Sequence, residues 1–549
     1  MRCLPSIISF VICVSPLAAS AGDVKRDLIQ RCDELAAMPG NPDNPPSIRG
    51  VFFYAVDFGH AVAACQSALK AAPNNRRIRF QYARALQAAK RYGESFDIYN
   101  QLSAEGYAPA QSNLGYAYDL GLGVAQNYEK AVAWYQKAAD QGDATAQVNL
   151  GYAYDYGLGV AQNHEKAVAW YLKAAEQGYA PAQNNLGYAY DYGLGVTQNY
   201  EKALVWYRKA ADQGYAGAQN SLGYAYEHGQ GVAQNYEKGV AWYQKAADQG
   251  DASAQYNLGY EYEHGQGVAQ SYEKAVAWYR KAADQGHAPA QNNLGYAYQH
   301  GKGVEQNYEK ALAWYQKAAD QGDASAQSSL GYAYEHGRGV EQNYEKAVAW
   351  YQKAAGQGVA SAQNGLGNAY DFGRGVVQNH EKAVAWYLKA AEQGYATAQD
   401  NLGYSYAYGQ GVAQNYETAL AWYRKAADQG DAIAQSYLGY AYAQGQGVAQ
   451  NYEKAVAWYQ KAADQGDASA QGNLGFLYAT GRGVTPDQLR AAKLFLLSGS
   501  ADYLKQLLTD RTRARKIQRR LRELGYYSGA IDGDFGAKSR AALHAYCGC

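Results

Sequence analysis

The chain contains 549 residues, with 50 basic and 50 acidic side chains and a formal net charge of zero. This length is too great for one compact domain, and the neutral balance excludes a general attraction to nucleic acid or anionic membranes. Tyrosine (55 residues) and glycine (60 residues) are far above ordinary usage, which indicates a repeated sequence rich in both.

Residues 1–21 have the pattern of a secretory signal peptide. Arg2 supplies a positive charge, residues 4–14 form an apolar run, and Ala19 and Ala21 mark a small-residue cleavage site. A short membrane anchor is the alternative. The run is too short to span a bilayer, and no later segment approaches the ~20 apolar residues that a spanning helix needs. We therefore expect an exported protein with no transmembrane span.

Two cysteines leave with the signal, and four remain. Cys32 and Cys65 flank a proline-rich loop within one small N-terminal unit, so we expect them to pair in an oxidising compartment. Cys547 and Cys549 are separated by one residue and would close only a tight ring. They could also remain free, or bridge to another chain.

The segment 22–107 precedes the repeats. Its first part, residues 22–59, contains four prolines and is expected to be irregular. Apolar spacing then predicts three helices, at residues 60–72, 74–89 and 93–105. This part is similar to a degenerate tetratricopeptide-type unit that caps an array.

All ten tryptophans follow one series with a step of 36 residues. A constant period of this length is typical of a solenoid, in which each repeat buries its apolar face against its neighbours. The series consists of Trp134, Trp170, Trp206, Trp242, Trp278, Trp314, Trp350, Trp386, Trp422 and Trp458.

The first repeat predicts two helices. One covers residues 108–120, buries Leu114 and its neighbours, and ends at glycines that allow positive φ. The other follows Asn127, which is placed to cap it, and runs to about residue 141. We expect Trp134 and Tyr135 to lie in the core between the two helices. Gly115 recurs in every repeat, which indicates a close approach of the helices.

The pattern A-x-A-Q-x-x-L-G-x-x-Y-x-x-G-x-G-V, followed by K-A-x-x-W-Y-x-K-A-A-x-x-G, resembles the Sel-1-like repeat. Eleven such repeats cover residues 108–503. The resemblance implies an all-α fold, a right-handed α-solenoid of helix-turn-helix repeats. It also implies an adaptor for protein complexes, here in the periplasm of a Gram-negative bacterium.

A second stripe follows the first helix of each repeat, on a face distinct from that of Leu114. If that helix lines the concave groove, as in the family, tyrosines edged with carboxylates would contact a neutral or basic protein or peptide, and not nucleic acid. The alternative is that the tyrosines pack against the next repeat and the carboxylates are a solvated edge. The stripe consists of Tyr116, Asp119, Tyr152, Asp155, Tyr188, Asp191, Tyr224, Glu227, Tyr260, Glu263, Tyr296, Tyr332 and Glu335.

Four histidines occupy one repeat position, each directly before a glycine: His228, His264, His300 and His336. A string of metal sites is one interpretation. Equivalent helices lie about 8–10 Å apart or more, which is too far for shared ligands at ~2 Å. We expect a capping or surface role, with no metal and no cofactor.

Residues 504–549 begin with a basic helix and continue into a Gly/Asp-rich turn and another helix. This segment resembles the peptidoglycan-binding domain found at the ends of bacterial wall enzymes. The resemblance implies that peptidoglycan is bound by Tyr526, Asp532, Gly533, Phe535, Gly536 and Arg540. The alternative is a basic helix that only seals the last repeat.

Motifs for catalysis are scarce. Ser67 and Lys70 fit S-x-x-K, but no K-T-G or S-D-N accompanies them. Some Sel-1-like proteins are β-lactamases, but those carry a disulfide in each repeat, and the repeats here contain no cysteine. We expect a non-enzymatic scaffold; a cell-wall enzyme such as a Sel-1-like β-lactamase is the alternative.

Overall fold

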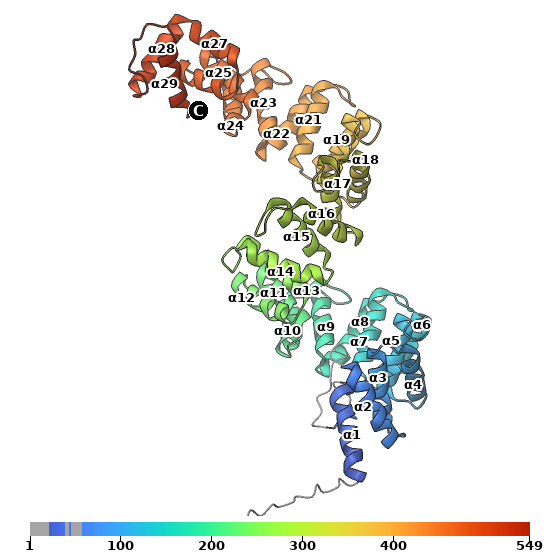
Figure 1. Ribbon diagram of the computed structural model, residues 1–549. Coiled ribbons are helices and arrows are strands. Elements are labelled where there is room, and N and C mark those ends of the chain that lie inside the picture. Colours follow the sequence, from blue (N-terminus) through green and yellow to red (C-terminus); the bar gives the residue numbers. More distant parts are fainter. Residues whose placement is uncertain (1–20, 39–42, 46–56, 549) are drawn as a thin grey trace, which may run out of the picture. The chain divides into compact units, whose positions relative to one another are not determined.

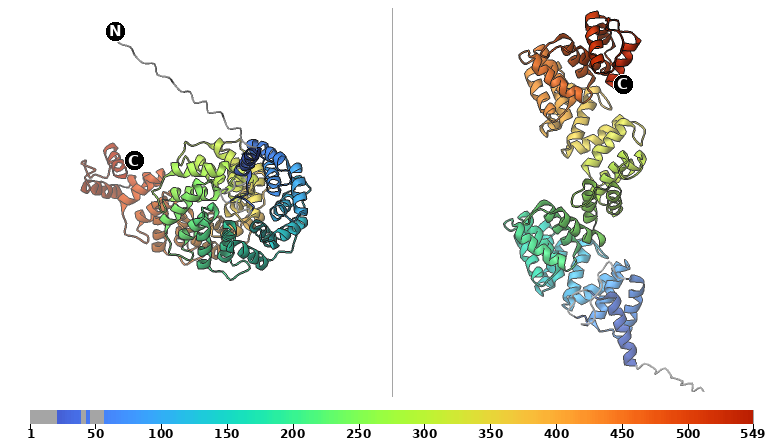
Figure 2. Two further views of the ribbon diagram at one scale, coloured as in Figure 1. Left: turned by 90° about the horizontal axis from the view of Figure 1, so that it is seen from below. Right: turned by 90° about the vertical axis from the view of Figure 1, so that its left-hand side faces the viewer.

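The computed structural model describes residues 21–38, 43–45 and 57–548. The predicted signal peptide, apart from Ala21, lies outside these residues. The described residues form 29 α-helices and no strand (Figure 1), which confirms the predicted all-α solenoid. They fall into two compact units, Met1–Gln270 and Ser271–Cys549. Within each unit, helices that follow one another in the chain pack against each other (Figure 2). Among these helices, none is long and apolar enough to cross a membrane.

Each of the eleven repeats contains two helices, which we call the A-helix and the B-helix. The A-helices are α5 (Ala108–Leu120), α7 (Ala144–Tyr156), α9 (Ala180–Tyr192), α11 (Ala216–His228), α13 (Ala252–His264), α15 (Ala288–His300), α17 (Ala324–His336), α19 (Ala360–Phe372), α21 (Ala396–Tyr408), α23 (Ala432–Gln444) and α25 (Ala468–Thr480). The B-helices are α6 (Tyr128–Asp140), α8 (His164–Glu176), α10 (Tyr200–Asp212), α12 (Tyr236–Asp248), α14 (Tyr272–Asp284), α16 (Tyr308–Asp320), α18 (Tyr344–Gly356), α20 (His380–Glu392), α22 (Tyr416–Asp428), α24 (Tyr452–Asp464) and α26 (Gln488–Leu497).

The residues predicted to cap these helices do so. The side chain of Asn127 accepts a hydrogen bond from the backbone N–H of Lys130 at 2.8 Å, at the start of α6. Gly121 ends α5 in the left-handed conformation, with a φ of 72°. Gly123 also has a positive φ, and a Cβ there would lie 2.5 Å from the carbonyl oxygen of Tyr92. The turn between the helices therefore packs directly on the preceding repeat.

Each A-helix packs against its B-helix at a glycine. A Cβ on Gly115 would lie 2.7 Å from the ring of Tyr135 and 3.1 Å from the carbonyl oxygen of Ala131. The ring of Tyr135 is only 2% exposed. This contact confirms the close approach predicted for Gly115.

The tryptophans do not lie in the buried core, and that part of the prediction is wrong. Trp134 is only partly buried, whereas the adjacent Tyr135 is buried. Trp170 packs from outside against a core that includes Tyr135 of the preceding repeat and Leu150 of its own. The Nζ of Lys137 lies 4.0 Å from the centre of the Trp134 ring and covers it. The tryptophans therefore join successive repeats at the surface.

A buried glutamine also joins successive repeats. The Nε2 of Gln147 donates to the carbonyl oxygen of Ala139 in α6 at 3.2 Å, and its Oε1 accepts from Gln177 in α8 at 2.8 Å. The side chain is 4% exposed. Because the last carbonyls of a helix have unused hydrogen-bonding capacity, this glutamine connects three helices without leaving a buried polar group unpaired.

The N-terminal segment contains one more helix than expected. Helix α1 (Ala21–Ala36) precedes α2 (Phe58–Ala71), α3 (Arg76–Ala88) and α4 (Tyr92–Ala104). The expectation of irregular structure from residue 22 onward is therefore wrong for α1. The prolines that suggested it begin only at position 39, so nothing in α1 itself interrupts a helix.

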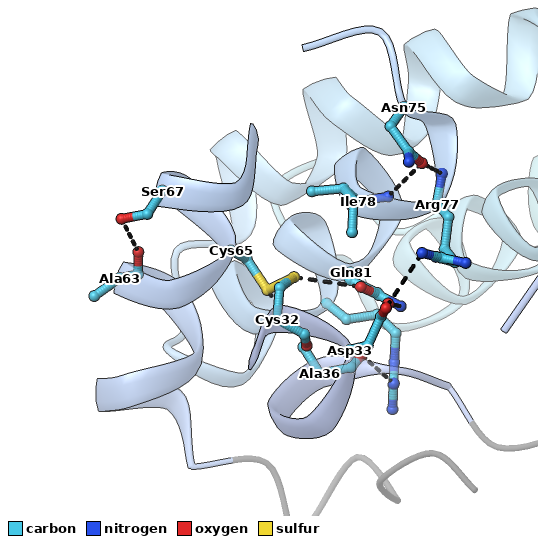
Figure 3. Close-up of a disulfide and its surroundings, with 11 residues drawn as sticks. Cys32, Asp33, Ala36, Ala63, Cys65, Ser67, Asn75, Arg77, Ile78 and Gln81 are labelled. Atoms are coloured by element: carbon cyan, nitrogen blue, oxygen red, sulfur yellow. Dashed lines mark hydrogen bonds and ion pairs between the residues drawn. A yellow bond between two sulfur atoms is a disulfide. The ribbon is translucent and has the colours of Figure 1, made fainter. Parts of the chain in front are cut away.

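The predicted disulfide is present between Cys32 in α1 and Cys65 in α2 (Figure 3). Polar contacts beside it reach α3. The Nε2 of Gln81 donates to Asp33 at 2.8 Å, and Arg77 forms an ion pair with Asp33 at 3.2 Å. The first helix is thus fixed covalently to α2 and by hydrogen bonds to α3.

The C-terminal segment packs onto the last repeats. It contains α27 (Ala501–Thr509), α28 (Arg511–Glu523) and α29 (Ala537–Cys547). Ala514, Ile517 and Leu521 of α28 are fully buried, in one core with apolar residues of α24, α25 and α26. The apolar face of this basic helix does cover the end of the array, as the alternative interpretation expected.

Replacing Gly295 by alanine should destabilise the protein, because a Cβ there would lie 2.7 Å from the ring of Tyr315. We expect a loss of about 1–3 kcal/mol, typical of overpacking, seen as a lower midpoint of thermal unfolding by circular dichroism. Gly356→Ala is the matched control, because no heavy atom lies within 4 Å of a Cβ at that position. Equal shifts in the two variants would contradict this account.

Candidate functional site

Tyrosines of the predicted stripe form an exposed column along the A-helices. Six of them have exposed fractions between 37% and 47%: Tyr116, Tyr152, Tyr188, Tyr224, Tyr260 and Tyr296. Tyr332 occupies the same position and is partly buried. None of the six is hidden against the next repeat, so this column remains available to a ligand.

A further column lies beside the first and was not predicted from the sequence. An aromatic residue four positions later stacks on most of these tyrosines, with ring centroids 4.3 Å apart for Tyr152 and Tyr156 and 4.0 Å apart for Tyr224 and His228. The i, i+4 spacing on one helix was the available signal. The other stacked pairs are Tyr188 with Tyr192, Tyr260 with His264, Tyr296 with His300, Tyr332 with His336, and Tyr404 with Tyr408.

The four histidines belong to this aromatic surface. The Nδ1 of His228 lies 3.1 Å from the carbonyl oxygen of Tyr224, and His264 and His336 make the same contact at 2.9 Å and 3.0 Å. These three rings therefore cap the ends of their own A-helices, as expected, whereas His300 contacts the side chain of Gln299 at 3.1 Å. The described residues contain no group of three or more His, Cys, Asp or Glu side chains able to hold a metal ion.

The carboxylates of the stripe are not a solvated edge. The buried Tyr135 hydroxyl donates to Asp119 at 3.2 Å, and Tyr243 donates to Glu227 at 2.5 Å. The same bond links Tyr171 to Asp155, Tyr207 to Asp191 and Tyr351 to Glu335. Burial is the main cause that raises the pKa of Asp119. These carboxylates thus satisfy core hydroxyl groups, and their charge is only partly available to a partner.

In two pairs of successive A-helices, asparagine side chains bond the helices directly. Asn257 donates to Asn220 at 3.0 Å, and Asn401 donates to Asn364 at 3.0 Å. Direct bonds of this kind are expected where helices converge on the inner side of a curved array. The aromatic columns lie on the same helices.

The A-helix α13 carries a buried carboxyl group at a position where the other A-helices have none. Glu261 is 1% exposed and stands where most repeats have alanine. Among the described residues, no N–H or hydroxyl group donates to its carboxylate oxygens. Burial first, and then the charge of Glu227, raise the pKa of Glu261. The group is therefore stable in the folded protein mainly in its protonated form.

In the C-terminal module, Gln518 organises the predicted binding turn. Its Nε2 donates to the carbonyl oxygen of Asp534 at 2.9 Å and to Ser539 at 3.2 Å, and its Oε1 accepts from the N–H of Gly533 at 3.0 Å. Asp532 is exposed, and the backbone N–H of Asp534 is the first cause that lowers the pKa of its carboxyl group.

The six residues predicted to bind peptidoglycan do not all reach the surface. Tyr526, Asp532, Gly536 and Arg540 are exposed, whereas Gly533 and Phe535 are buried and shape the turn. A groove of about 710 Å³ lies beside this turn. Basic side chains from α27, α28 and α29 line it together with apolar ones, among them Lys505, Arg511, Arg540, His544, Leu508 and Phe535.

The isolated S-x-x-K motif lies on α2. The hydroxyl of Ser67 donates to the carbonyl oxygen of Ala63 at 3.0 Å, within the same helix (Figure 3). A serine bonded in this way is not hydrogen-bonded to a general base, which a nucleophilic serine needs.

Comparisons with known proteins agree with these observations. A family model described as "Sel1 repeat" matches eleven consecutive segments over residues 108–503, and one described as "Putative peptidoglycan binding domain" matches residues 510–546. The crystal structure of c5321, a protective antigen of uropathogenic Escherichia coli strains with an SLR fold, is 36% identical. That match covers 82% of this chain and 93% of that one, with a TM-score of 0.62.

A Sel1 repeat protein from Oxalobacter formigenes is 37% identical, and the match covers 44% of this chain and 96% of that one, with a TM-score of 0.42. No curated protein matches the chain.

Replacing Glu261 by alanine should stabilise the protein at alkaline pH. The unfolded carboxyl group ionises near its ordinary value of 4.5, whereas the folded group holds its proton until about pH 8. Stability should therefore fall as pH rises through this window. We expect the variant to gain about 1–3 kcal/mol at pH 8 and little at pH 4, measured by thermal unfolding. The exposed Glu237→Ala should show no such difference; a gain in Glu261→Ala that does not depend on pH would contradict the assignment.

Proposed function

Because the chain belongs to the family of Sel1 repeat proteins, we propose that it is a non-enzymatic adaptor of the cell envelope. In this proposal the A-helices hold a protein or peptide partner, and the C-terminal module docks on peptidoglycan. The single observation that carries the proposal is the double column of exposed aromatic rings along the A-helices. Rigid aromatic side chains bind with little loss of conformational entropy, and they are frequent hot spots of interfaces.

The groove beside α28 supports the docking half of the proposal. Arg511 and Arg540 line it together with the apolar Leu508 and Phe535. Charged arginine donors bind carboxylates strongly, and peptidoglycan is rich in carboxylates. The apolar residues would contact the uncharged faces of the polymer.

The proposed compartment is the periplasm of a Gram-negative bacterium. The signal-like pattern of residues 1–21 supports export. A disulfide between Cys32 and Cys65 fits an oxidising compartment. The absence of enzyme activity is part of the proposal, and the contact of Ser67 with its own helix supports it.

The full chain should co-sediment with purified peptidoglycan. In the double variant Arg511→Gln and Arg540→Gln, we expect the bound fraction to fall at least about tenfold, since each lost charged hydrogen bond weakens binding by about 1.5–3 kcal/mol. Arg519→Gln removes a charge from the same helix outside the groove and should bind normally. Equal binding of all three proteins would contradict docking through this groove.

A photoreactive amino acid at Tyr260 or Tyr296 should crosslink the same protein in cells that express the full chain. Each position lies in the exposed tyrosine column of its own unit. Ala313, which is exposed on the B-helix α16, is the control position and should give no such product. Equal products from Ala313 would contradict partner binding along the A-helices.

A further inference from the structure

Four repeats of the second unit hold a cation of their own chain between two aromatic rings. Lys302 lies 5.2 Å from the ring centre of Tyr272, in the preceding B-helix, and 5.0 Å from that of Tyr296, in its own A-helix. Arg338 lies in the same way between Tyr308 and Tyr332, at 5.6 Å and 5.0 Å. A cation over such rings is attracted by their electron-rich faces.

The arrangement recurs in two further repeats. Arg374 lies 5.8 Å from the ring centre of Tyr344 and 5.1 Å from that of Phe372, and Arg482 lies 5.6 Å from Tyr452 and from Phe476. Three of these four cations are arginines. We call the space between these two rings, one from a B-helix and one from the A-helix of the next repeat, the aromatic notch. Its two rings suit a guanidinium group.

In the tenth repeat the chain supplies no cation at this position. Gln446 occupies the place that Arg482 has one repeat later. The two rings of the notch, Tyr416 and Tyr440, are present, and they line a cavity of about 80 Å³ together with Gln446. A cavity of that size takes the head group of one side chain.

Two residues that depart from the repeat pattern line this notch. Ala407 replaces the carboxylate found at this position in most repeats, and Tyr437 replaces an asparagine, serine or glycine. The ring of Tyr437 stacks on Tyr423 with centroids 4.8 Å apart and an angle of 14° between the planes. Together with Tyr408, these residues line the same cavity.

The Tyr423 hydroxyl is the polar group of the pocket. The side chain is 2% exposed, and its hydroxyl is buried without a hydrogen-bond partner among the described residues. In most other repeats this hydroxyl donates to a carboxylate or amide of the A-helix, as Tyr135 does to Asp119 and Tyr315 does to Gln299. At Tyr423 the phenol oxygen is thus free to accept an N–H from a ligand.

The charges around the pocket favour a cation. No lysine or arginine lines it. Asp400 is 8% exposed, and burial raises the pKa of its carboxyl group to about 7, so near neutral pH it is charged only in part. In its charged form it is among the causes that raise the pKa of both Tyr423 and Tyr437. Asp467 lines the hollow that adjoins the pocket. An anionic ligand would be repelled here, whereas a cation would be attracted.

We propose that this pocket binds the guanidinium group of an arginine from a protein partner. The group would lie between the rings of Tyr416 and Tyr440, as Arg338 and Arg482 lie in their own notches, and would donate an N–H to the oxygen of Tyr423. This inference rests on the proposed function, because it gives the chemistry by which the A-helices recognise their partner: a segment with an exposed arginine.

The test is saturation-transfer difference NMR with the full chain and Nα-acetyl-arginine methylamide. The citrulline analogue has the same shape without the charge, and N-acetylglucosamine tests for a sugar site. We expect the arginine probe to bind about tenfold more tightly than either, the difference that cation–π attraction of about 1.4 kcal/mol gives. Equal binding of the citrulline analogue or the sugar, or no binding of arginine, would overturn the proposal.

Gln446→Arg should abolish binding of the probe, because the new side chain fills the notch as Arg482 does. Gln266→Arg introduces the same side chain at the equivalent position of the first unit and should leave binding unchanged. Tyr437→Asn restores the usual residue and should also weaken binding at least about tenfold. Circular dichroism checks that all variants fold. Unchanged binding in Gln446→Arg would place the arginine elsewhere and overturn the assignment.

These outcomes are separate from those that test the adaptor function. The probe assay needs no partner, so arginine binding can fail while crosslinks from Tyr260 and Tyr296 are still found. In that case only the pocket assignment is wrong.

Discussion

The contact between a glycine of the A-helix and a tyrosine of the B-helix determines the rest of each repeat. The ring of Tyr135 lies where a side chain on Gly115 would be, so the two helices approach closely and the ring is fixed in one orientation. That orientation sends the hydroxyl toward the end of the A-helix, where Asp119 accepts it. A buried hydroxyl without a partner destabilises the fold. The first role of the carboxylate is therefore to accept this hydrogen bond, and contact with a partner is secondary.

The contact between Gly115 and Tyr135 explains the roles of the other residues of the A-helix. Leu114 faces the core, Gly115 admits the tyrosine, and Asp119 satisfies the hydroxyl. What remains for a partner is the column of Tyr116 and the rings that stack on it. A surface with two aromatic columns and carboxylates that are partly buried is less acidic than the sequence suggests. It favours recognition by stacking and by cation–π contacts more than by long-range charge.

The sequence predicts the fold well because the repeat is a local structure. The predicted bounds of α5, residues 108–120, coincide with the observed helix, since capping residues and glycines act within one turn. Trp134 and Tyr135 are adjacent and both aromatic, so only the three-dimensional contact with Gly115 decides which faces the core. The role of Asp119 depends on a residue 16 positions away, which no local pattern reveals. The exposed column could be predicted because its tyrosines lie on a different helix face from the buried Leu114. Its contact with a partner stays a prediction.

Some repeats lack the A-helix residue that accepts the hydrogen bond of the buried tyrosine hydroxyl. These repeats differ in whether the tyrosine is replaced as well. In the last repeat Ala479 removes the acceptor, and Phe495 replaces the tyrosine, so the hydroxyl is removed together with its partner. In the ninth repeat Ala407 removes the acceptor, but Tyr423 keeps its hydroxyl, and Tyr437 of the next repeat adds a ring beside it. In the tenth repeat Ala443 also removes the acceptor and Tyr459 keeps its hydroxyl, so the buried, unpaired hydroxyl and the added ring of Tyr437 are what set the ninth repeat apart. The ninth repeat retains a polar group and adds aromatic surface around a cavity, which is the arrangement expected of a site that a ligand completes.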